Sequence, residues 1–166
     1  MNQHGEVAIG TYSLLIQNEK SISPEEAWLI TAKTFNINSN KHDCPRNAFL
    51  GLYESKLLLN ISTQPIITRT INNKYYALVA VQILLSDGRI SKNSLLNKMN
   101  EIIGFHRTQY GDVADVVLAL WDAKYIIKEI DLSEEIERLR KNIEEKEKLR
   151  KKINPSIDDL LGDLDI

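Results

Sequence analysis

The chain has few of the residues that build disulfides or metal sites. Among its 166 residues there are one cysteine, Cys44, and three histidines. A single cysteine cannot form an intramolecular disulfide or a cysteine-based zinc site. Because disulfides are typical of oxidising compartments, we expect a cytoplasmic protein that holds no metal and no cofactor.

A charge excess and a long apolar run are also missing. The formal net charge is −2, so composition gives no global electrostatic reason to expect binding to nucleic acid or to an anionic membrane. The longest mostly apolar stretch, residues 75–85, is too short to span a bilayer. The first residues lack the basic region and apolar core of a signal peptide. We therefore expect no membrane partner.

The sequence also lacks the motifs of common enzyme classes. It contains no glycine-rich phosphate loop, no Gly-x-Ser-x-Gly and no His-Glu-x-x-His. Asp43, Glu54 and Lys56 are similar to the Asp…Glu-x-Lys set of metal-dependent nucleases, but Glu54 and Lys56 would point to different faces of a helix end. His42 and Cys44 offer only two metal ligands. These observations predict a protein that is not an enzyme.

What the chain does contain is an internal repeat. Residues 43–58 align without a gap to residues 111–126, an offset of 68 positions. The same offset relates residues 21–23 to 89–91, and one residue of slippage extends the similarity to residues 8–15 and 77–84. A fixed spacing of this kind indicates one supersecondary unit used twice.

Periodicity predicts that each unit consists of three helices. In the first unit, an apolar pattern over residues 8–15 precedes a helix start at Ser23, where Pro24 and Glu26 complete a capping box. A third helix begins near Pro45. Residues 57–61 and 66–71 are β-prone and flank a turn at residues 62–65, which is typical of a short hairpin. The second unit predicts helices over residues 74–86, 92–103 and 112–123.

A highly charged helix follows the two units. Four acid-then-base pairs at i, i+4 mark it, and it ends before Pro155. Its apolar residues follow a short heptad pattern: Leu132, Ile136, Leu139 and Ile143. This stripe needs a partner, which is either a second copy, giving a homodimer, or the body of the same chain. The sequence slightly favours self-association.

The last segment alternates acidic and apolar residues. It is typical of a short peptide that docks in the groove of a partner through Leu160, Leu161, Leu164 and Ile166. A frayed terminus is the simpler interpretation. The predicted organisation is mainly α: a first helical repeat at 1–72, a second at 73–130, the charged helix at 131–154 and the tail at 155–166.

The start of the third helix is a candidate contact site for nucleic acid or a protein. Arg46 and Asn47, with Lys41 before them, occupy the place where helix-turn-helix proteins contact bases. Three helices followed by a hairpin are also the order of a winged helix. The alternative is that these residues are local caps or surface partners, because no cluster of basic residues surrounds them.

Two motifs resemble those of a known family. Residues 44–52 are similar to a Cys-Pro-Lys-Asn-Ala-Phe-Leu-Gly-Leu run, with Arg46 in the Lys position, and residues 115–121 are similar to an Asp-Val-Val-x-Ala-Leu-Trp run. Both occur in a family of uncharacterised bacterial proteins, a domain of unknown function. The resemblance covers about residues 4–127 and implies no activity.

Together these patterns predict a non-enzymatic interaction or adaptor protein, a subunit of a bacterial or phage complex with a protein partner. The alternative is a winged-helix-like DNA-binding protein that dimerises through the charged helix.

Overall fold

Seven α-helices account for most of the residues that the structure describes, and no strand occurs among them. The computed structural model describes residues 2–18, 21–39, 44–64, 66, 71–104 and 110–153. The mainly α class predicted from periodicity is confirmed. The helices are α1 (Gln3–Gln17), α2 (Pro24–Thr34), α3 (Cys44–Glu54), α4 (Ile71–Asp87), α5 (Lys92–Ile103), α6 (Gly111–Asp122) and α7 (Ser133–Ile153).

Serine caps begin two of the helices. At α2, the Glu26 amide donates to Ser23 Oγ and the Ser23 amide donates to Glu26 Oε2, each at 3.1 Å. This is the predicted capping box, and Pro24 occupies the first turn. Ser91 caps α5 in the same way through the Ser94 amide. The sequence signals therefore set these two helix starts locally.

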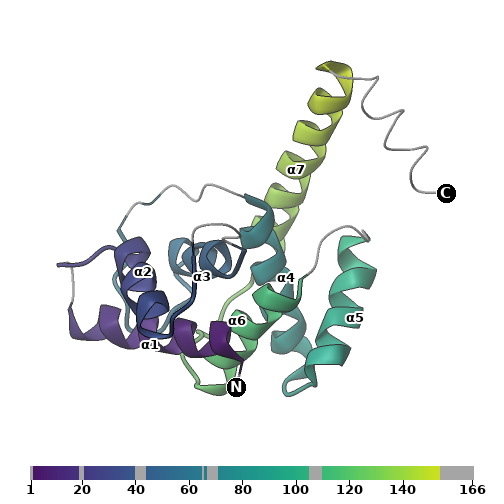
Figure 1. Cartoon of the computed structure of the whole chain (residues 1–166). Helices are drawn as coiled ribbons and strands as arrows, with labels where there is room; N and C mark the ends of the chain where they lie inside the picture. The colour runs from purple at the N-terminus through teal and green to yellow at the C-terminus, as the bar shows by residue number, and fades with distance from the viewer. Residues whose placement is uncertain are drawn as a thin grey trace.

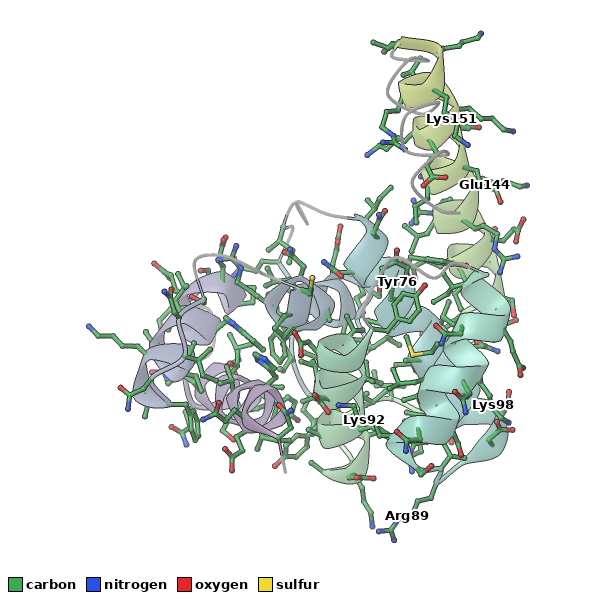
Figure 2. All side chains as sticks on the ribbon, turned by 45° about the vertical axis from the view of Figure 1, so that its right-hand side comes forward. Tyr76, Arg89, Lys92, Lys98, Glu144 and Lys151 are labelled. Atoms are coloured by element: carbon green, nitrogen blue, oxygen red, sulfur yellow. The ribbon has the colours of Figure 1, made fainter. Side chains whose placement is uncertain are left out.

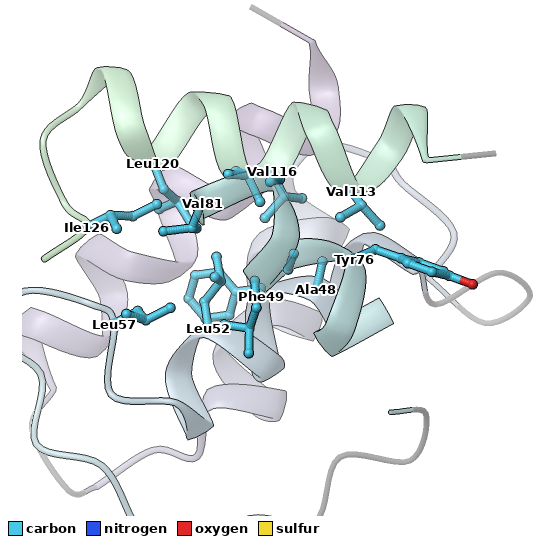
Figure 3. Packing of buried hydrophobic residues seen from close by; sticks show 14 of the residues in the cluster. Ala48, Phe49, Leu52, Leu57, Tyr76, Val81, Val113, Val116, Leu120 and Ile126 are labelled. Atoms are coloured by element: carbon cyan, nitrogen blue, oxygen red, sulfur yellow. The ribbon is translucent and has the colours of Figure 1, made fainter. Parts of the chain in front are cut away.

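The helices of residues 1–72 and 73–130 pack across one another. α1 lies against α2 and α6, while α3 lies against α4 and α6. In Figure 3, Val113, Val116 and Leu120 of α6 face Ala48, Phe49 and Leu52 of α3 across one layer of side chains. The buried apolar residues form one continuous cluster. The two predicted units thus share a core.

Helix α4 is buried on every side. The run Asn73–Val81 is buried without interruption, followed by Ile83 and Leu84. The helix contacts α3, α5, α6 and α7 (Figure 1). A helix that is apolar around its whole circumference belongs in the centre of a fold. The stretch that is too short to span a bilayer is therefore the central helix, and no described helix is long and apolar enough to cross a membrane.

Gly51 sets the distance between α3 and α4. A Cβ atom built on Gly51 would lie 2.8 Å from both Cα and Cβ of Lys74. Real carbon atoms do not approach so closely, so only glycine permits this crossing.

A group of charged residues surrounds Lys74 where three helices meet. Lys74 is buried, and its Nζ lies 3.2 Å from Glu54 Oε2 at the end of α3 and 3.3 Å from Glu135 Oε1 on α7. Ser55 Oγ donates to Glu135 Oε1 at 3.0 Å. An unpaired ammonium would be costly in this position, so the two carboxylates are needed to keep α3, α4 and α7 together.

The predicted hairpin is not seen among the described residues, where the first arm forms no strand. Leu58 forms an isolated antiparallel bridge with Ile126 instead of pairing within residues 57–71. Two backbone hydrogen bonds flank the bridge, from the Leu59 amide to the Tyr125 carbonyl and from the Ile127 amide to the Leu57 carbonyl, both at 2.8 Å. Leu57 and Leu58 are buried, so the β-prone run is used to join the two halves. Most of the second arm lies outside the described residues.

Tyrosines occupy the N-terminal ends of α4 and α6. Tyr110, just before α6, packs edge-on against Tyr76 of α4 with ring centroids 4.7 Å apart. Burial, followed by the neighbouring Tyr76 and Tyr75, raises the pKa of Tyr110 to about 12. The pKa of Tyr12 is also raised, first by burial and then by Tyr125, on which its ring stacks.

We predict that Gly51→Ala lowers the free energy of unfolding by about 1–3 kcal/mol, because the added methyl group overpacks the crossing of α3 and α4. Gly111→Ala is the matched control, since its Cβ would meet only Lys92 Nζ at 3.9 Å. It should be neutral or stabilising by up to about 1 kcal/mol. Urea unfolding of both variants measures the difference, and equal stabilities would contradict the role given to Gly51.

We predict that Tyr110 makes stability sensitive to alkaline pH. With a folded-state pKa of about 12, the tyrosine keeps its proton longer when folded than when unfolded. Stability is therefore fully present below the unfolded pKa of about 10 and falls as pH rises from there towards about 12. Tyr110→Phe should lose stability less steeply over this range in urea titrations. If the free energy of unfolding falls equally steeply with pH in the wild type and the variant, Tyr110 makes no contribution.

Candidate interaction surface at the last helix

Arg46 and Asn47 do not form an exposed contact site. Their exposed fractions are 8% and 5%, because the first turn of α3 is covered by its neighbours. Arg46 Nη1 lies 3.7 Å from Glu25 Oε1 at the start of α2. Both residues are therefore buried where α2 meets α3, and their role in contacting nucleic acid or a protein stays a prediction.

Other predicted site residues lie outside the described residues. These are Lys41 and the four apolar residues of the tail: Leu160, Leu161, Leu164 and Ile166. Asp43 and His42 of the weighed metal sites lie outside as well, while Glu54 is paired with Lys74. Within the described ranges no group of three or more His, Cys, Asp or Glu side chains could hold a metal ion.

The heptad stripe of α7 packs against the body of its own chain. Leu132, Ile136 and Leu139 are buried, and Ile143 is partly buried against the same core. Their neighbour is α4. Of the two partners considered for this stripe, the structure therefore has the intrachain one. The slight preference for self-association through these four residues is corrected, because α4 needs a cover on this side.

Beyond this stripe, α7 projects away from the other helices (Figure 1). We call residues 144–153 the distal segment. Every residue in it is exposed, and Leu149 and Ile153 have exposed fractions of 58% and 68%. Figure 2 shows Glu144 and Lys151 on this segment, well separated from Lys92 and Arg89 on the body. The distal segment therefore exposes both apolar and charged side chains.

A groove lies at the base of the projecting helix, between α4, α5 and α7. Its main part has a volume of about 370 Å³ and a second part of about 260 Å³ shares Ile102 and Arg140 with it. Ile102, at the end of α5, has an exposed fraction of 44%. The full lining is Asn72, Tyr75, Tyr76, Val79, Gln82, Ile102, Ile103, Ser133, Ile136, Glu137, Arg140, Ile143, Glu144 and Glu147.

The groove lining carries more acidic than basic side chains. Arg140 Nε donates to the Tyr75 hydroxyl at 3.2 Å, and Arg140 Nη1 lies 3.6 Å from Glu137 Oε2. The hydrogen bond to Tyr75 is the main reason that the pKa of Arg140 is raised, so this guanidinium stays charged. Glu144 and Glu147 add two further acids to the lining. A partner that supplies cationic groups would meet an excess of carboxylates here.

One buried polar atom also faces this groove. Gln82 Oε1 is buried and accepts no hydrogen bond from the described residues. Buried acceptors are normally satisfied, so this amide marks a place for a donor group.

A second hollow of about 300 Å³ lies on the first half of the chain. Uncharged residues line it: Leu15, Ser21, Ile22, Ser23, Pro24, Tyr53, Asn60, Ile61, Ser62, Gln64 and Ile66. The Gln64 amide donates to the Tyr53 hydroxyl at 2.9 Å. Trp121, which is aligned with Tyr53 by the repeat, is instead covered by Lys128, 4.8 Å from its ring. The two halves therefore differ on this surface.

Of the groove lining, Ile136 and Ile143 were identified from sequence, and these only as part of the heptad stripe. Ile102 and Ile103 end a helix whose apolar pattern predicts burial, and Tyr75 belongs to the apolar run of α4. The only local signal was that two adjacent isoleucines cannot both face inward on a helix.

Comparison with known proteins gives a family for most of the chain. No curated protein and no solved structure is detectably similar to it. The model of a family of unknown function (DUF6979) matches residues 1–127, which contain α1 to α6 and the backbone bridge. The match ends before α7, so the groove combines family residues with a helix outside the matched region. The chain belongs to this family of unknown function.

Proposed function

We propose that the chain is a non-enzymatic interaction or adaptor protein, a subunit of a larger bacterial or phage complex, and that a protein partner binds in the groove between α4, α5 and α7. The observation that carries this proposal is the exposed Ile102 in a groove that also contains Ile103 and Ile143, beside a projecting helix that contributes Glu144 and Glu147 to the lining. Large exposed apolar side chains inside a concave, partly polar surface are typical of interaction sites.

The residues that line the groove indicate which kinds of side chain a partner would need in order to bind there. Ile102, Ile103 and Tyr76 would hold apolar side chains, while Glu144 and Glu147 favour basic ones. An amphipathic helix or extended peptide with lysine or arginine beside two or three apolar residues has this character. The acidic tail at 155–166 has the opposite charge, so we propose that it binds a different surface on a partner.

We also propose that the two halves are copies of one three-helix unit. Leu58 and Ile126, which form the bridge, are 68 positions apart, and so are the capping residues Ser23 and Ser91. Lys56 and Lys124 both have left-handed backbone conformations, with φ of 59° and 63°. The repeat would act as a scaffold that holds α4 and thereby the groove.

The alternative of a DNA-binding protein has less support. Arg46 and Asn47 are buried, and the net charge is −2. A gel-shift titration of the full chain with duplex DNA at low salt is the direct test. Salt-dependent retardation would favour the alternative.

We predict that Ile102→Arg weakens partner binding at least about tenfold, which corresponds to 1.4 kcal/mol, because a charge replaces the exposed apolar floor. Ile30→Arg on α2 is the matched control, since Ile30 is exposed to 52% and lies outside the groove. Both substitutions should change the free energy of unfolding by no more than about 0.5 kcal/mol.

The measurement has two steps. The tagged full chain and both variants are first used to isolate partners from the native host, and the purified partner is then titrated by calorimetry. Loss of affinity in the Ile102 variant alone supports the groove. Equal affinity for both variants and the wild type contradicts it, and loss only after removal of residues 156–166 would assign binding to the tail.

A further inference from the structure

We propose that two copies of the chain associate through their distal segments of α7, arranged antiparallel. This inference uses a different face of α7 from the groove, although Glu144 and Glu147 border both, and it does not depend on the groove having a partner. It concerns the part of α7 that no other described helix covers.

A second apolar stripe lies on the distal segment. Asn142, Lys146, Leu149 and Ile153 follow a 4-3-4 spacing, so they share one face of the helix. This stripe contains none of the residues that face the core or line the groove. Leu149 and Ile153 are the two most exposed large apolar side chains among the described residues. Such a pair is the seam of a short helix–helix contact.

Charge along the distal segment favours a second copy as the occupant. Its first turn carries Glu144, Glu145 and Glu147 around Lys146, while the basic residues that follow are Lys148, Arg150, Lys151 and Lys152. When two such segments run antiparallel, the acidic turn of each lies beside the basic turn of the other. In this register Glu145 of one copy lies beside Lys152 of the other copy. The two-fold symmetry of the dimer forms the same ion pair a second time. The helix is thus complementary to a reversed copy of itself.

A parallel arrangement is less favourable. It would place Lys146 against the same lysine of the second copy at the centre of the seam, and like charges at such a position oppose association. In the antiparallel arrangement Lys146 instead lies beside Leu149 of the second copy. Its aliphatic stem can cover that leucine while the ammonium reaches solvent.

The body provides a place for the tip of the second helix. Beside Asn142 is a hollow of about 220 Å³ whose apolar lining includes Ile66, Ile71 and Leu139. In the antiparallel register Ile153 of the second copy lies next to Asn142 and hence at this hollow. The distal segment is about 15 Å long, so the two bodies sit at opposite ends of the contact. Because each copy contributes only two large apolar side chains, the association should be weak and concentration-dependent.

Sedimentation velocity of the purified full chain, from low micromolar to millimolar concentration, tests the proposal. The wild type should shift from monomer towards dimer as concentration rises. Leu149→Asp combined with Ile153→Asp should remain monomeric throughout. The control, Leu29→Asp combined with Ile30→Asp on the exposed face of α2, should behave like the wild type. Circular dichroism establishes that every variant is folded.

Charge reversal tests the orientation. Glu145→Lys and Lys152→Glu should each weaken dimerisation several-fold, and the two changes combined should restore it. A wild type that stays monomeric at millimolar concentration overturns the proposal, as does a dimer that is unaffected by the Leu149 and Ile153 changes. Single reversals without effect overturn the antiparallel register. If dimerisation occurs only after residues 156–166 are removed, the chain's own tail occupies the stripe and a second copy does not.

This experiment is independent of the groove. It uses the purified chain without a partner, and Ile102→Arg should leave dimerisation unchanged. Failure of the proposed function therefore gives a different result from failure of dimerisation.

Discussion

The burial of α4 on all sides is the constraint on which the rest of the structure depends. Its two ends carry polar groups, and the buried Lys74 needs carboxylates within reach. Glu54 on α3 and Glu135 on α7 supply them, and Gly51 lets α3 come close enough to do so. A central helix of this kind requires cover from several directions, so the folds of both halves and the position of α7 follow from it.

The same constraint gives α7 two different parts. Its first turns complete the cover of α4, and the distal segment extends past the end of the core with nothing left to bury. The groove forms at the edge of this cover, between the buried tyrosines of α4, the last turn of α5 and α7. The match to the family model ends before α7, so the groove joins residues inside the matched region to a helix outside it.

Much of the fold could be predicted from local signals. Capping residues such as Ser23 act within one turn, and apolar periodicity gave α5 its observed bounds. The site could not be predicted so well, because burial of a polar residue depends on distant neighbours. Arg46 has the composition of a surface contact, but Glu25 and the packing of α2 enclose it. Leu58 has the propensity of a hairpin strand, but its pairing partner lies after α6. No signal in the neighbouring sequence distinguishes a buried Arg46 from an exposed one, or a Leu58 that pairs after α6 from one that pairs in a hairpin.

The packing of α1 against α6 has a consequence for how the chain is made. The buried face of α1, with Val7, Ala8 and Tyr12, is covered by a helix that begins about a hundred residues later. At about 5–20 residues per second, a ribosome exposes the first helix for several seconds before its cover exists. Throughout that interval the nascent chain carries an apolar surface in water.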